Sequence, residues 1–357
     1  MHLTKLLTLI LALFVGALAA TAGTSLLATW ATVDGGVGSG AIYGLSIDGT
    51  NAYCQLGLNN LVQIVRIADI GGAQTRTQLV SPATWIAASG GTSCTSFQGF
   101  DVSGTDYLQF GDVTSDAIWR VNKYTGELIR YCSKQTISNF TGFSNVALGA
   151  IQCVNPANGE HVFFDSTSSK VLTTGGSNVV SLLFNESDVT AALGAGATIN
   201  GSMNFDNSGN LYFGTTSSTA GFLAKRDTGG NFSIVFTKHV LTNMTLVSSA
   251  STSGTMKMGP NGFTFRNGSG TAAALLQFDP ADPSGTLSVF ASTNALLTSV
   301  AASANLNCIR FYGTYPNAGS GWAWHQFGQN GIYLTEVPEP VVIGLLGFAA
   351  LVLRRFV

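Results

Sequence analysis

The sequence ATWATVDGG at residues 28–36 recurs as ATWIAASGG at residues 83–91, an offset of 55 residues. A second pair is 105 residues apart, about two periods of 52 residues, because FDVSG at residues 100–104 returns as FDNSG at residues 205–209. Self-similarity at a fixed period of 20–50 residues is typical of a chain built from small repeated units. The repeat therefore predicts an array of similar units along the whole body.

Each unit divides into four short runs of apolar and β-branched residues separated by Gly or Asn. Such runs predict strands, and glycine supplies the positive φ that tight hairpin turns require. Four antiparallel strands in about 50 residues predict one blade of a β-propeller. We therefore expect an all-β fold, a six-bladed β-propeller of four-stranded antiparallel blades. The expected blades lie near residues 41–80, 96–133, 150–184, 202–237, 255–291 and 303–336.

The composition excludes two classes of protein. The 357 residues include 16 Lys and Arg against 18 Asp and Glu, so the net charge of -2 offers no basic stripe for nucleic acid. The hydrophobic content of 45% argues against disorder. With so few charges, the surface depends on hydroxyl and amide groups, which also hydrogen-bond to hydrated polysaccharide.

The N-terminal segment has the features of a targeting signal. Lys5 precedes an apolar run from Leu6 to Ala19, and small residues at 17–22 offer cleavage sites after Ala19 or Ala22. This order predicts a secretory signal peptide over residues 1–22, read as a helix and removed by signal peptidase. The protein is therefore expected to be exported, with residues 23–336 as its body.

The C-terminal segment has the features of a second targeting signal. Val337, Pro338, Glu339 and Pro340 precede thirteen mostly apolar residues, 341–353, and the pair Arg354 and Arg355. A helix of thirteen residues reaches only about 20 Å, short of a hydrocarbon core of about 30 Å, so it suits a transient anchor. The arginine pair should stay in the cytoplasm, which leaves the body outside.

Residues 337–357 resemble the PEP-CTERM sorting segment of Gram-negative bacteria that make extracellular polysaccharide. The resemblance implies an exosortase as processing partner, an inner-membrane-anchored precursor, and a mature form at the cell surface or in the extracellular matrix. The string DNSGNLY at residues 206–212 also resembles the inner hairpin of NHL-type propellers.

Sequence motifs for catalysis are missing, so no catalytic residue, cofactor or metal is assigned. The three histidines of the body, His161, His239 and His325, are expected at the surface or rim. The expected innermost strands carry no carboxylate, and Lys257 would repel a cation at the axis. Asp48, Asp101 and Asp206 are expected to bond the backbone of their own turns.

Two candidate binding regions remain, each beside a plainer alternative. Gln98, Gln152, Asn204 and Lys257 are expected to line the channel, where they either bind a ligand or only pack. Trp322 and Trp324 either contact a glycan or pack between blades. Residues 279–285 form either a calcium-binding loop or a proline-rich hairpin turn. The five cysteines leave at least one thiol free, with Cys54 and Cys94 as one possible pair.

Three functions fit these features. The first is an exported, non-catalytic structural or glycan- or protein-binding propeller that meets the inner membrane transiently and extracellular polysaccharide afterwards. The second is an exported propeller enzyme acting on a lactone or glycan. The third is a matrix protein that assembles into a sheath or filament through its blade edges.

Overall fold

The computed structural model describes part of the chain in detail. The described residues are 24–36, 42–57, 62–90, 97–103, 106–194, 196–216, 223–245, 256–259, 262–267, 274–292, 309–314, 321–326 and 329–336. The expected helices within residues 1–22 and 341–353, the PEP motif at 337–340 and the pair Arg354 and Arg355 lie outside them. Among the described residues, no helix has the length and apolar character needed to cross a membrane.

Five blades are each built from four consecutive antiparallel strands. The first blade holds β2 (Ile42–Asp48), β3 (Asn51–Leu56), β4 (Gln63–Ala68) and β5 (Thr75–Val80). The second holds β6 (Phe97–Ser103), β7 (Tyr107–Asp112), β8 (Ala117–Asn122) and β9 (Leu128–Cys132). The third holds β10 (Leu148–Val154), β11 (His161–Asp165), β12 (Lys170–Gly176) and β13 (Val179–Asn185).

The remaining two of these five blades follow the same plan. The fourth holds β14 (Thr198–Phe205), β15 (Leu211–Thr216), β16 (Leu223–Arg226) and β17 (Phe232–Phe236). The fifth holds β18 (Met256–Gly259), β19 (Gly262–Asn267), β20 (Ala274–Phe278) and β21 (Ser288–Ser292). The all-β propeller architecture is thus confirmed.

The sixth four-stranded sheet, called the closing sheet below, has a different construction. It joins β22 (Ile309–Thr314), β23 (Gly321–Gln326) and β24 (Gln329–Glu336) to β1 (Thr24–Thr29), in the order β1-β24-β23-β22. The prediction of six blades that each fold from four consecutive strands is therefore wrong. Five blades fold in this way, and the ring is closed by β1 together with β22, β23 and β24. Antiparallel pairing places Thr24 opposite Thr335.

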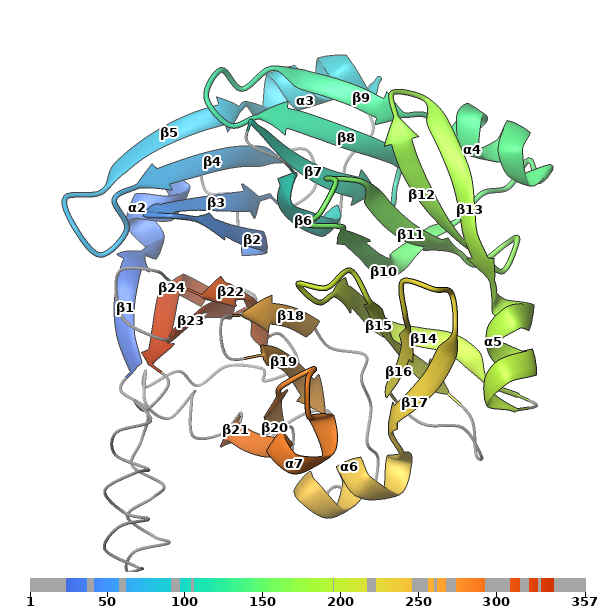
Figure 1. Ribbon diagram of the computed structural model, residues 1–357. Helices are drawn as coiled ribbons and strands as arrows, with labels where there is room; N and C mark the ends of the chain where they lie inside the picture. Colours follow the sequence, from blue (N-terminus) through green and yellow to red (C-terminus); the bar gives the residue numbers. More distant parts are fainter. Residues whose placement is uncertain are drawn as a thin grey trace, which may run out of the picture.

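The sheets form a closed ring around an axis (Figure 1). Each innermost strand contacts its two neighbours, β2 with β6, β6 with β10, β10 with β14, β14 with β18, β18 with β22, and β22 with β2. Closure leaves each sheet only a short outer edge, which limits unwanted strand pairing.

Short helices follow the outermost strands, which the all-β prediction did not include. They are α2 (Trp30–Asp34), α3 (Pro82–Ser89), α4 (Lys134–Thr141), α5 (Glu186–Leu193) and α6 (Lys238–Thr245). The two stretches from ATW to GG cover α2 and most of α3. Thr29 and Ser81 accept backbone N–H bonds at the start of these helices, and Gly35 and Gly90 end them in the left-handed region. A further helix, α7 (Pro283–Thr286), lies between β20 and β21.

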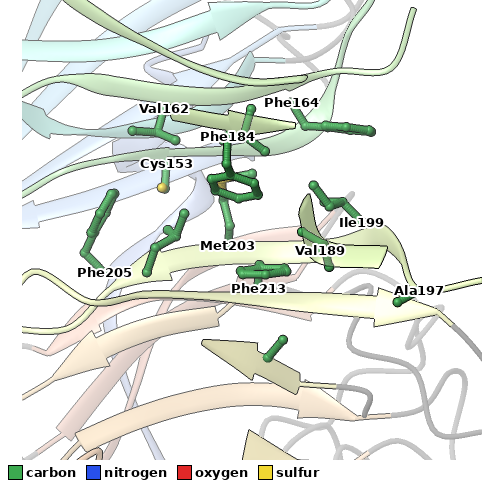
Figure 2. Packing of buried hydrophobic residues seen from close by; sticks show 13 residues of the cluster. Cys153, Val162, Phe164, Phe184, Val189, Ala197, Ile199, Met203, Phe205 and Phe213 are labelled. Atoms are coloured by element: carbon green, nitrogen blue, oxygen red, sulfur yellow. The ribbon is translucent and has the colours of Figure 1, made fainter. Parts of the chain in front are cut away.

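Apolar layers between neighbouring blades hold the ring together. Figure 2 shows the layer between the third and fourth blades, where Phe184, Met203 and Phe213 lie together. Phe213 is fully buried, and burial of such a side chain contributes about 1.5–3 kcal/mol. Similar layers join the first blade to the second and the fourth to the fifth. The interface of the second and third blades combines an apolar outer part with the polar inner part described next.

Candidate functional site

An ion pair crosses the axis of the propeller. Lys257 on β18 contacts the Oδ2 atom of Asp101 on β6. The blades of these two strands are opposite each other, since two sheets separate them on either side of the ring. Ser46 on β2 donates its hydroxyl to Asp101 Oδ1 at 2.6 Å. Three inner strands are thus tied at one point.

This contact corrects the expected role of Asp101. Its carboxylate accepts the N–H of Val102 at 2.9 Å, as a turn aspartate would, but it also binds the cross-axis lysine. The expectation of an axis without a carboxylate is therefore wrong. Asp206 does bond its own turn, accepting from the N–H groups of Ser208 and Asn210.

The amide of Gln152 fills a gap left by two glycines of the neighbouring blade. Its Nε2 donates to Gly149 O at 2.7 Å, and its Oε1 lies 2.7 Å from His161 Nε2. A Cβ on Gly111 would come within 1.9 Å of this Oε1, and a Cβ on Gly99 within 2.9 Å of the His161 ring. At Gly99, where φ is +60° and an added Cβ would also lie 3.0 Å from Gln152 Cβ, glycine lets the third blade pack closely on the second, whereas a Cβ on Gly111 would displace the Gln152 amide.

His161 is sealed inside this interface, so the expectation of a surface or rim position for it is wrong. Its side chain is fully buried, and its Nδ1 has no hydrogen-bond partner. Burial first, and the positive charge of Arg120 second, lower the pKa of His161 to about 3. The imidazole therefore stays neutral near pH 7. His239 on α6 is exposed, as expected, and the side chain of His325 lies outside the described part.

Polar groups around the histidine satisfy one another. Arg120 donates from Nε to Gln109 Oε1 at 2.8 Å and stacks its guanidinium 3.5 Å from the ring centroid of Tyr131. Gln109 also approaches Thr174 at 3.5 Å. The contacts of Arg120 with Gln109 and Tyr131 lie within the second blade, whereas its Nη2 donates to Gly159 O of the third blade at 3.3 Å and so joins the two blades.

The four predicted channel residues do not gather into one pocket. Gln152 bonds His161, Lys257 bonds Asp101, and Asn204 donates to Met256 O at 2.9 Å, which links the fourth and fifth blades. Gln98 is on β6, but its side chain is not described. Trp322 and Trp324 alternate on β23, where the structure describes only the backbone.

Cysteines and carboxylates provide no ready metal centre in the described ranges, where no cluster of three or more His, Cys, Asp or Glu side chains could hold an ion. Cys54 is a free, buried thiol, and Cys94, its possible partner, lies outside the described residues. Burial raises the pKa of Cys54 to about 12. In the 279–285 segment, Asp279 and Asp282 accept backbone N–H bonds within the turn.

One further charged pair escaped the sequence analysis. Lys123, which follows β8, extends to Asp48 at the end of β2, with Nζ 2.5 Å from Oδ2. The repeat marks Asp48 and Asp101 as turn residues, but nothing in the periodicity indicates which distant lysine each carboxylate meets. The separations along the chain are 75 and 156 residues.

The ring of antiparallel sheets around a polar axis defines a β-propeller. No family model matches the sequence, and no curated protein matches it. Solved structures do match. A protein of unknown function from Bacteroides thetaiotaomicron aligns with a TM-score of 0.50 at 11% identity, over 82% of this chain and 68% of that one.

Two further solved structures are similar at lower scores. A catalytically inactive virginiamycin B lyase from Staphylococcus aureus with quinupristin gives a TM-score of 0.48 at 11% identity, over 87% of this chain and 99% of that one. TolB from Acinetobacter baumannii gives 0.45 at 12% identity, over 80% and 63%. At these identities the likeness concerns the fold alone and says nothing of activity.

Proposed function

We propose that this chain is an exported, non-catalytic β-propeller that is sorted through a PEP-CTERM and exosortase route to the cell surface or an extracellular polysaccharide matrix, where it binds glycan. The observation that carries the proposal is the position of the first and last strands. β1 begins at Thr24, two residues after the expected signal peptide, and β24 ends at Glu336, directly before Val337. Removal of the signal peptide and of the sorting segment would leave every described strand intact.

The pairing of β1 with β24 adds support. Because Thr24 lies opposite Thr335, the signal peptide and the sorting segment are attached to the same end of one sheet. An anchored precursor would therefore be held at a single place on the ring. The rest of the propeller would be free to complete its fold outside the membrane.

The polar groups near the axis support a binding role rather than a catalytic one. Asp101 is neutralised by Lys257 and bonded by Ser46, so its carboxylate is not free to act as a base. His161 is buried with its pKa lowered to about 3, which makes it a poor proton carrier near neutral pH. The hydroxyl- and amide-rich surface suits a hydrated polysaccharide.

Sorting is tested by replacing Pro338, Glu339 and Pro340 together with alanine in a host that has an exosortase. The variant should accumulate as a membrane-bound precursor with its tail attached, whereas Glu127→Ala, an exposed change in the body, should leave release unaltered. Fractionation and the mass of the C-terminal peptide give the readout. Normal release and surface display of the triple variant would contradict the sorting role.

Glycan binding is tested separately with an immobilised glycan array. The protein should retain a set of polysaccharide fragments, and should leave them chemically unchanged on long incubation. Appearance of cleaved or ring-opened products would favour the enzyme hypothesis instead. The two tests are independent, since failure of sorting leaves binding open and the reverse holds as well.

A further inference from the structure

The turn between β8 and β9 presents a tyrosine to solvent. Tyr124 is 62% exposed, the highest value among the exposed large hydrophobic side chains of the described residues. A single exposed aromatic residue is common on protein surfaces and by itself indicates nothing. Two features set this one apart: the rigidity of its turn and the carboxylate beside it.

Hydrogen bonds fix the backbone of this turn. The side-chain Oδ1 of Asn122 accepts from the N–H groups of Tyr124 and Thr125, both at 2.9 Å. Gly126 donates its N–H to Asn122 O at 3.0 Å. At φ +75°, Gly126 also presses on the first blade, because a Cβ there would come within 2.1 Å of Leu79 O. The tyrosine is therefore presented by a turn with a fixed backbone, so that a ligand has to order only its side chain.

The residue before the tyrosine holds the carboxylate. The Lys123 side chain is only 3% exposed, and its Nζ lies 2.5 Å from Asp48 Oδ2. The same Nζ lies 5.9 Å from the centroid of the Tyr124 ring, and the backbone N–H of Lys123 is fixed by Asp106 O at 2.8 Å. The Asp48 side chain remains 43% exposed. A buried ammonium thus orients an accessible carboxylate next to an accessible aromatic face.

A structural role alone accounts for only part of this arrangement. The ion pair joins the first and second blades, but desolvating a lysine is costly and a buried pair is weak evidence for stability. In addition, the ion pair of Lys123 and Asp48 does not require the neighbouring ring of Tyr124 to be exposed. A flat apolar ring beside a fixed hydrogen-bond acceptor of neutralised charge is complementary to a sugar ring. The sugar offers a C–H face to the aromatic ring and adjacent hydroxyl donors to the acceptor.

We propose that Tyr124 and Asp48 form a subsite for a neutral pyranose residue of a polysaccharide. The ring of Tyr124 stacks on the C–H face of the sugar, and the Asp48 carboxylate accepts hydrogen bonds from its hydroxyl groups. Lys123 cancels the charge of Asp48, so the subsite favours uncharged sugars over uronic acids. This inference rests on the proposed glycan-binding function and gives it a location at the first and second blades.

The experiment measures Kd by titration calorimetry with the purified protein. The probes are hexasaccharides of β-1,4-glucose, α-1,4-glucose, β-1,4-mannose and β-1,4-galactose. Tyr124→Ala should weaken binding of the best probe about tenfold, whereas Tyr124→Phe, which keeps the ring, should stay within about twofold. Phe143→Ala is the matched control, because this aromatic side chain is also exposed, at 45%, but belongs to the segment after α4 and not to the turn between β8 and β9. That variant should bind like the wild type.

Asp48→Asn adds a second test, with about a fivefold expected loss, since an amide accepts less strongly than a carboxylate. This change leaves Lys123 without its counter-ion, so its melting temperature must first match that of the wild type; the tyrosine variants decide the matter if it does not. Wild-type binding that is unaffected by Tyr124→Ala would overturn the subsite and leave the glycan-binding function standing. Wild-type protein that binds none of the four probes would overturn the neutral-sugar subsite, and the array result then decides the wider function separately.

Discussion

The buried histidine makes the stability of the propeller depend on pH in a specific way. The pKa of His161 is about 3 in the folded protein, against an ordinary value of 6.5. Between these values the unfolded chain binds one proton more than the folded chain. Stability is therefore fully present above pH 6.5 and is lost as the pH falls below it. Integrating this difference from pH 7 to pH 5 gives a loss of about 2 kcal/mol from this residue alone.

The perturbation that isolates this contribution is His161→Gln. Glutamine does not titrate, and its amide can still bond Gln152, so the variant should lose about 2 kcal/mol less than the wild type between pH 7 and pH 5. The assay is urea unfolding at both pH values, followed by circular dichroism. Carboxylate contributions are common to both proteins and cancel in the comparison. His239→Gln, a change at an exposed site on α6, serves as the matched control and should follow the wild type.

If His161→Gln loses as much stability as the wild type on acidification, the imidazole must already bind a proton in the folded state. The sealed, neutral histidine described above would then be incorrect, and with it the account of how the second and third blades meet.

Three further predictions concern the closure of the ring. Gly99→Ala should destabilise the protein by about 2 kcal/mol more than Gly36→Ala in urea unfolding, because both glycines have positive φ but only Gly99 has atoms within 3.0 Å of the added Cβ. Equal losses of stability would contradict the close approach of the second and third blades. Lys257→Met should lower the free energy of unfolding by about 1–2 kcal/mol, since it leaves the partly buried Asp101 without its counter-ion, and adding Asp101→Asn should recover part of the loss. A double variant that is no more stable than Lys257→Met alone would argue against the cross-axis pair. Deleting residues 24–29 should produce aggregation by exposing an edge of β24, which light scattering would detect, and a monomeric, fully stable deletion protein would disprove the closing role of β1.

The sequence carried the blade pattern because hairpin strands are local. Runs of apolar residues between glycines predicted the four-stranded plan of a blade without any knowledge of the ring. The closing sheet was missed although its signal was present: the repeated stretch from ATW to GG covers α2 as it covers α3, so β1, which precedes α2, corresponds to the outermost strand β5, which precedes α3. Treating residues 24–29 only as the sequel of a signal peptide concealed that correspondence.

The site was less predictable, for a physical reason. Gln152, Asn204 and Lys257 were placed on inner strands from the repeat, which follows from local strand order. Their partners were not, since Asp101 meets Lys257 from the opposite side of the ring and the separation of 156 residues follows no period. Burial of His161 likewise depends on glycines in another blade. Contacts of this kind are set by how the sheets meet, which a single repeat does not encode.

The most direct test of the account is the intact mass and peptide map of the protein recovered from the surface of cells that have an exosortase. The recovered protein should start after Ala19 or Ala22 and end near residues 337–340, with every strand from β1 to β24 retained. Recovery of an uncut chain, from Met1 to Val357, in the cytosol would contradict it.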